Sequence, residues 1–182
     1  MTMFTTFVSL TRLTAMIAAA TFLLAAADGA SAKDGTIEVP AALNPNKLSI
    51  FRVVSATGVQ VYACTRNPAG ATGWVLKGPD AKLFDPQKKP VGKHYAGPTW
   101  EGLDGGRVVG AVKTSMPAPV DKAIPWLLLD TKSREGPGAF AEAKAIVRMG
   151  TTGGTAPRDG CDEARAGREL RVPYTAIYVF LK

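Results

Sequence analysis

The chain of 182 residues contains only one histidine, His94, and this scarcity excludes several kinds of catalytic site. A zinc site with three histidines, a copper site with two, and a helical histidine pair spaced four residues apart all need more than one. The sequence also lacks the G-x-S-x-G turn of many hydrolases and the glycine-rich loops that bind nucleotide phosphates. We therefore expect neither a metal nor another cofactor.

The sequence has no hydrophobic run of the length that a membrane-spanning helix needs, about 20 residues. The longest run, over residues 13–27, follows a mildly basic start and precedes Ala30-Ser31-Ala32, a small-x-small site of the kind that signal peptidase cleaves. We predict a signal peptide over residues 1–32, cleaved after Ala32; the alternative for the run is a buried N-terminal helix. The mature protein is then secreted or periplasmic, with no integral membrane segment.

With 46% hydrophobic and 20% charged residues, the composition is that of an ordinary globular protein. Residues 33–46 contain two prolines and no sustained period, so we expect an extended lead-in to a single β domain over residues 47–182. In that domain, short runs of β-branched and aromatic residues alternate with turns of glycine, proline and aspartate. The pattern predicts an all-β, mainly antiparallel fold, a β-sandwich or barrel of about 8–10 short strands with one or two short helices.

Local turn signals add detail to this fold. We expect hairpins at Thr57-Gly58 and at residues 78–80, and a tight turn at residues 104–106. Residues 138–144 and 162–166 favour the short helices, and Asp162 is a suitable N-terminal cap for the second.

The formal net charge of +7 is spread along the chain and forms no dense basic stripe. A nucleic-acid-binding protein usually shows such a stripe or a recognisable module, so we expect no nucleic-acid partner. A basic surface fits an anionic envelope ligand, and it equally fits a solvated surface without any partner.

The two cysteines, Cys64 and Cys161, both lie after the predicted signal peptide. An even number of cysteines in an exported chain favours a disulfide, because the compartment is oxidising. We predict a Cys64–Cys161 bridge; the alternative is two buried free thiols.

Candidate site residues gather in residues 92–102, around a glycine–proline turn: His94, Tyr95, Trp100 and Glu101. If Glu101 approached His94 across the turn, it would raise the imidazole pKa and orient the ring, as in an acid–base dyad. The alternative is a buried, structural His94 with Trp100 in the core.

Six motifs occur in order along the chain and together resemble one known family. They are Phe84-Asp85, the segment GKHYAGPTWE at 92–101, IPWLLL at 124–129, GGTAP at 153–157, GCD at 160–162 and VPYTA at 172–176. This set resembles the exported bacterial and fungal family catalogued as domain of unknown function 3455, over residues 39–181. The resemblance implies a secreted single-domain protein with a signal peptide, and it implies no reaction, substrate or metal.

Three functional hypotheses remain open. The leading one is a non-enzymatic binding module for an envelope or extracellular ligand, with polysaccharide among the candidates, on a surface formed by His94, Tyr95, Trp100, Glu101 and Trp126. The second is a small hydrolase or lyase that uses His94 and Glu101. The third is a structural or stress-related envelope protein. Exposed tryptophans would favour the first hypothesis, and an open pocket lined by His94 would favour the second.

Overall fold

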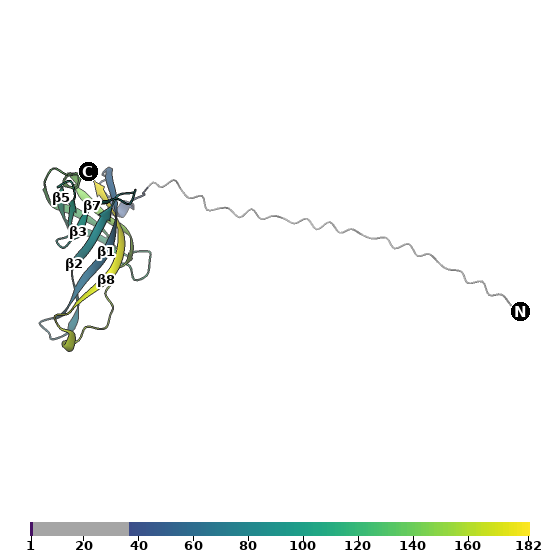
Figure 1. Cartoon of the computed structure of the whole chain (residues 1–182), viewed down its shortest axis with the longest axis vertical. Helices are drawn as coiled ribbons and strands as arrows, with labels where there is room; N and C mark the ends of the chain where they lie inside the picture. Colours follow the sequence, from purple (N-terminus) through teal and green to yellow (C-terminus); the bar gives the residue numbers. More distant parts are fainter. Residues whose placement is uncertain (2–36) are drawn as a thin grey trace. The chain divides into compact units, whose positions relative to one another are not determined.

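The structure, a computed structural model, describes Met1 and residues 37–182, and its folded unit runs from Glu38 to Lys182. That unit is a closed barrel of eight antiparallel strands, each paired with the next and β8 paired back to β1 (Figure 1). The all-β prediction is confirmed, and of the two predicted architectures, sandwich and barrel, the structure is the barrel. The strands are β1 (Ile50–Arg66), β2 (Thr72–Phe84), β3 (Pro90–Tyr95), β4 (Thr99–Gly102), β5 (Arg107–Met116), β6 (Trp126–Glu135), β7 (Ala145–Gly153) and β8 (Glu169–Leu181).

The helices of the described residues are short 3-10 turns: η1 (Ala41–Leu43), η2 (Ala139–Glu142) and η3 (Glu163–Arg165). The last two lie where the sequence predicted short helices, and the Asp162 side chain caps η3 by accepting a hydrogen bond from the Arg165 N–H. No helix in the described part of the chain is long and apolar enough to cross a membrane. The predicted signal peptide, residues 1–32, lies outside the described residues except for Met1.

The two hairpins predicted at residues 57–58 and 78–80 are wrong, because β1 and β2 each continue through them as one long strand. Gly58 lies at a close approach of the two strands, because a Cβ there would sit 2.2 Å from the Asp80 carbonyl oxygen. Gly78 adopts a positive φ of 148° beside an irregularity in the β1–β2 register. Both glycines therefore shape a bent strand, which is the other role that glycine takes in sheets.

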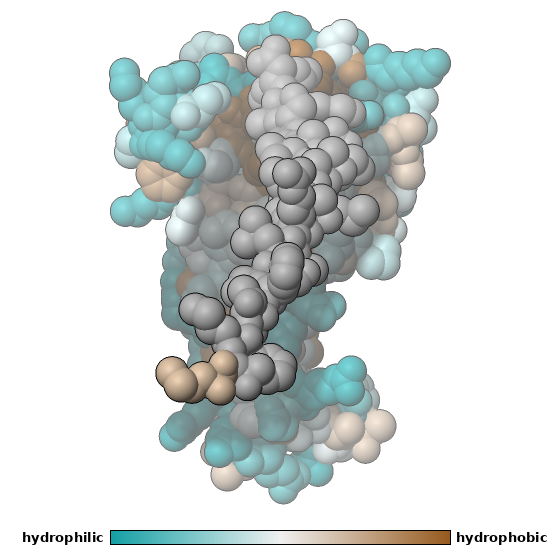
Figure 2. Space-filling view, turned by 90° about the vertical axis from the view of Figure 1, so that its right-hand side faces the viewer, coloured by the Kyte–Doolittle hydropathy of each residue, from teal (hydrophilic) through white to brown (hydrophobic). Residues whose placement is uncertain are grey.

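Side chains alternate between the barrel interior and its outer surface, as the pleat of a strand requires. Along β8, Tyr174, Ala176, Tyr178 and Phe180 share the inner face, and all four belong to the hydrophobic core. Figure 2 shows hydrophilic residues over much of the visible outer surface. A polar side chain in this apolar interior is therefore unusual and indicates a candidate functional site.

One end of the barrel is closed by η2. The Phe140 ring of this turn stacks on the Phe180 ring with the centroids 4.6 Å apart, and Phe140 is only 2% exposed. The Asp104 carboxylate accepts a hydrogen bond from the Ala139 N–H and so fastens η2 to the β4–β5 turn, which is the tight turn predicted at residues 104–106. This end of the interior is therefore filled.

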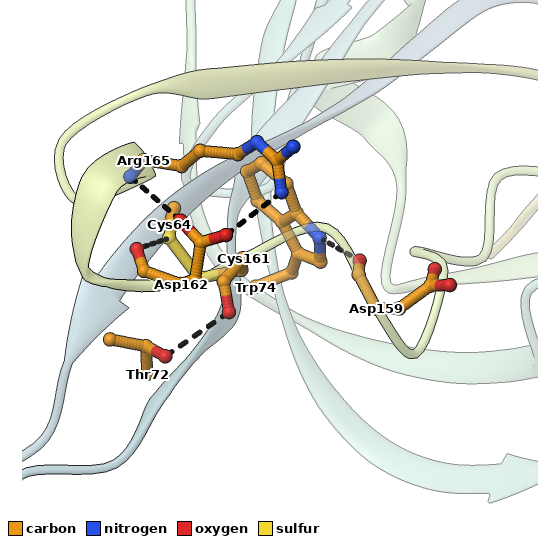
Figure 3. Close-up of polar contacts among 7 residues, drawn as sticks. All are labelled: Cys64, Thr72, Trp74, Asp159, Cys161, Asp162 and Arg165. Atoms are coloured by element: carbon orange, nitrogen blue, oxygen red, sulfur yellow. Dashed lines mark hydrogen bonds and ion pairs between the residues drawn. A yellow bond between two sulfur atoms is a disulfide. The ribbon is translucent and has the colours of Figure 1, made fainter.

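The predicted disulfide is confirmed: Cys64 and Cys161 are bonded and link β1 to the segment between β7 and β8 (Figure 3). Two hydrogen bonds support the same junction, because the Thr72 hydroxyl donates to the Cys161 carbonyl and Trp74 Nε1 donates to the Asp159 carbonyl (Figure 3). The long β7–β8 connection is thus held against the ends of β1 and β2.

Candidate functional site

The barrel contains a cavity of about 330 Å³ at the end opposite η2. Each of the eight strands contributes at least one residue to its wall, and Gly97 and Pro98 of the β3–β4 turn line its mouth. Eight-stranded barrels have interiors that side chains either fill completely or leave open for one small ligand. This barrel is filled at one end and open at the other.

The floor of the cavity is a cluster of three buried rings, His94, Trp100 and Tyr178, each at most 2% exposed. His94 and Trp100 are opposite each other in the β3–β4 register, and their rings stack with centroids 4.3 Å apart. The Tyr178 ring meets both edge-on, with centroid distances of 4.8 Å to His94 and 5.2 Å to Trp100. Such packing fixes the rings, so the floor is rigid and preformed.

The burial of His94 decides its protonation state. Loss of solvent lowers the pKa of the imidazole to about 3, and the nearby positive charge of Arg148 acts in the same direction. His94 Nδ1 lies 2.8 Å from the Thr99 carbonyl oxygen, which can only accept, so Nδ1 carries the hydrogen. At neutral pH the ring is therefore uncharged, and its other nitrogen, Nε2, is an acceptor.

Two buried donors in the cavity wall have no partner in the described structure. Gln60 and Trp100 are each 1% exposed, and neither Gln60 Nε2 nor Trp100 Nε1 makes a hydrogen bond. Both residues line the cavity. A buried donor without a partner costs about 1–3 kcal/mol, and most buried polar groups in native proteins do have partners. The fold itself therefore supplies no hydrogen-bond acceptor for these two donors, which a bound ligand would supply.

The charged residues of the cavity wall are Lys77 and Arg148, and no aspartate or glutamate of the described chain lines it. Arg148 lies on β7 opposite Tyr178 of β8 and Leu127 of β6, which also line the cavity. Its guanidinium donates from Nε and Nη2 to the Pro125 carbonyl oxygen, at 3.0 and 2.9 Å. The wall is thus apolar with a positive potential.

Comparison with known proteins places the chain in a family. The family profile described as Protein of unknown function (DUF3455) matches residues 45–182. The chain belongs to this family. No curated protein and no solved structure matches it.

Strand alternation separates the four candidate residues of this DUF3455 chain into two pairs. His94 and Trp100 face the interior, whereas Tyr95 and Glu101 lie in the β3–β4 pair together with Lys93. The Tyr95 hydroxyl donates to Glu101 Oε2 at 2.7 Å, and Lys93 Nζ lies 3.1 Å from Glu101 Oε1. These contacts, the Tyr95 bond first, lower the pKa of Glu101. The structure does not bring Glu101 to His94.

The tryptophans do not form one exposed aromatic face. Trp100 is in the barrel interior, Trp74 is partly buried beside the disulfide, and Trp126 is partly buried at the start of β6. Trp126 Nε1 is a further buried donor without a partner in the described residues. No group of three or more metal-ligating side chains occurs in the described range.

Of the lining residues, only His94 and Trp100 were sequence candidates; those missed include Gln60, Arg148 and Tyr178. A signal for the first existed, because Gln60 occupies the same alternating positions as Val54 and Ala56 and so breaks an apolar series on β1. Arg148 similarly continues the inward alternation from Ile146 on β7. A polar residue among the apolar, inward-facing positions of a strand is thus the sequence signal for a residue of the cavity.

Proposed function

We propose that this domain is an exported binding protein without catalytic activity, which holds one small organic molecule in the open end of its barrel. The observation that carries the proposal is the pair of unpaired donors, Gln60 Nε2 and Trp100 Nε1, in the wall of a preformed cavity. Pockets of a few hundred Å³ with a mostly apolar lining and a few convergent polar groups are typical ligand sites. Export is supported by the disulfide and by the signal-peptide pattern of residues 1–32.

A small ligand suits this geometry better than a polysaccharide. Binding of a polymer by stacking needs exposed aromatic rings, and Trp100, the central candidate, is 1% exposed. A ligand that reaches Trp100 must enter the barrel from the β3–β4 turn. The ligand is therefore a compact molecule of the envelope or the extracellular medium.

Binding also suits the site better than hydrolysis. With a pKa lowered to about 3, His94 is a weak base at neutral pH. Serine, threonine, cysteine and carboxylate side chains, the usual nucleophiles of hydrolases, are missing from the described residues of the cavity wall.

The test uses N-phenyl-1-naphthylamine, an uncharged dye whose fluorescence rises in apolar surroundings. We expect one dye molecule to bind per domain, and a Val112→Trp substitution at the cavity mouth to weaken binding by tenfold or more. Val75→Trp is the matched control, because Val75 and Val112 are similarly exposed, at 51% and 58%, and only Val112 lines the cavity. Dye binding that is absent, or equal in both variants, would overturn the proposal.

A further inference from the structure

The polar groups of the cavity wall are mainly hydrogen-bond donors. The Gln60 amide and the Trp100 indole each present an unpaired N–H. The Arg148 guanidinium adds a positive charge and the three N–H groups that do not donate to the Pro125 carbonyl. A ligand that satisfies them must supply acceptors. An ionised carboxylate only accepts, carries the charge opposite to guanidinium, and matches it in a planar, two-bond geometry.

Arg148 has no carboxylate partner among the described residues, although ion pairs hold several arginines on the outer surface, such as Arg107 with Glu135. Burial is the main cause of the pKa shifts of the nearby rings, lowering the pKa of His94 and raising that of Tyr178, and the charge of Arg148 acts to lower both. Arg148 is only partly buried, and a carboxylate beside it would form charge-assisted hydrogen bonds with its guanidinium.

Gln60 and Arg148 lie at the same part of the wall. A Cβ on Gly154 would sit 3.2 Å from Gln60 Cγ and 2.9 Å from Ile124 Cγ2, so Gln60 and Ile124 converge on Gly154. The next residue after Ile124 is Pro125, whose carbonyl oxygen holds the Arg148 guanidinium. Both side chains also line the same cavity, so a head group bound there meets donors from this region of the wall.

We propose that the cavity binds an amphipathic monocarboxylate, with its carboxylate at Arg148 and Gln60 and its apolar body against Leu127, Leu129 and Val112. This assignment rests on the proposed binding function and names the class of ligand. The volume of about 330 Å³ lies within the range of pockets that hold one small organic molecule. A single partly buried guanidinium matches one negative charge, because Lys77, the other cation of the wall, is exposed.

The experiment measures displacement of N-phenyl-1-naphthylamine by three ten-carbon probes at pH 7.5: decanoate, decanol and decylamine. The apolar bodies are nearly the same, so differences report the head group. We expect decanoate to bind at least tenfold more tightly than decanol, and decylamine, a cation, to bind most weakly. Equal affinities for decanoate and decanol would overturn the monocarboxylate assignment while leaving the binding function intact. Failure of all three probes to displace the bound dye would also overturn it.

A variant then locates the anion site. Arg148→Gln should reduce decanoate affinity by tenfold or more and change decanol affinity by less than twofold. Arg134→Gln is the matched control, because Arg134 is exposed on β6 and does not line the cavity. A preference for decanoate that persists in Arg148→Gln would place the anion elsewhere and overturn the proposal. If this variant does not fold, Arg148→Lys keeps the charge, and the wild-type probe series still decides the ligand class.

Discussion

Replacing His94 with asparagine tests whether the buried imidazole makes the fold sensitive to acid. His94 is 2% exposed, and burial lowers its pKa from 6.5 to about 3. In the unfolded chain the ring keeps its ordinary pKa, so between these two values the unfolded state binds a proton that the folded state does not bind. The contribution of neutral His94 to the free energy of unfolding is therefore fully present above about pH 6.5, and it is lost as the pH falls toward 3.

The size of the effect follows from the two pKa values. Each unit of pKa difference corresponds to about 1.4 kcal/mol, so the whole window is worth about 4–5 kcal/mol, and the step from pH 7 to pH 5 about 2 kcal/mol. Asparagine removes the titrating group. Its Nδ2 can still donate to the Thr99 carbonyl, which His94 Nδ1 contacts in the wild type. The pKa values of Glu101 and Asp104 are lowered, so these carboxylates stay ionised above pH 5 and do not disturb the comparison.

The assay is urea unfolding at pH 7 and at pH 5, followed by tryptophan fluorescence. We expect the wild type to lose about 2 kcal/mol more than His94→Asn between the two pH values. At pH 7 the variant should itself be less stable by about 1–3 kcal/mol, because the contacts of the ring with Trp100 and Tyr178 are lost. Equal losses for the two proteins between pH 7 and pH 5 would refute the reasoning.

Three other predictions concern separate parts of the chain. Replacing Cys64 and Cys161 together with alanine should lower the free energy of unfolding by about 2–5 kcal/mol, since the bridge spans 97 residues of separation; an unchanged urea midpoint would contradict this. N-terminal sequencing of exported protein should find a start at residue 33, and a start at Met1 would rule out cleavage after Ala32. Glu101→Gln should leave dye affinity within twofold of wild type, because Glu101 pairs with Tyr95 and Lys93; a tenfold loss would assign Glu101 to the site.

For the part of the site in residues 92–102, the sequence could predict which side chains share a face of the sheet. The glycine–proline turn at residues 97–98 is visible in the sequence, and a hairpin around it pairs His94 with Trp100. The period of two then places Glu101 on the opposite side of the sheet from His94. Proximity in sequence favoured a His94–Glu101 dyad, whereas strand parity argues against it. The parity rule needs only the register, which the turn supplies.

The rest of the site depends on how the barrel closes. Gln60 is on β1, Trp100 on β4 and Arg148 on β7, and these strands meet around one cavity only because β8 returns to pair with β1. No local pattern encodes that closure. The same limit explains Gly58, whose role is set by the close approach of Asp80 from the neighbouring strand. A glycine at such a crossing and a glycine in a turn look alike in sequence.

The balance of stability in the barrel favours a ligand as the missing partner of its unpaired donors. Apolar side chains at Gln60 and Arg148 would fill the interior without unpaired donors or charge, as Phe140 and Phe180 do at the closed end. The two unpaired donors alone cost about 1–3 kcal/mol each. A ligand that pairs with them binds the folded state only, so a concentration one hundred times its dissociation constant stabilises the fold by about 2.7 kcal/mol. The open end of the barrel is therefore less stable alone than when occupied, which is what a binding site built into a rigid scaffold requires.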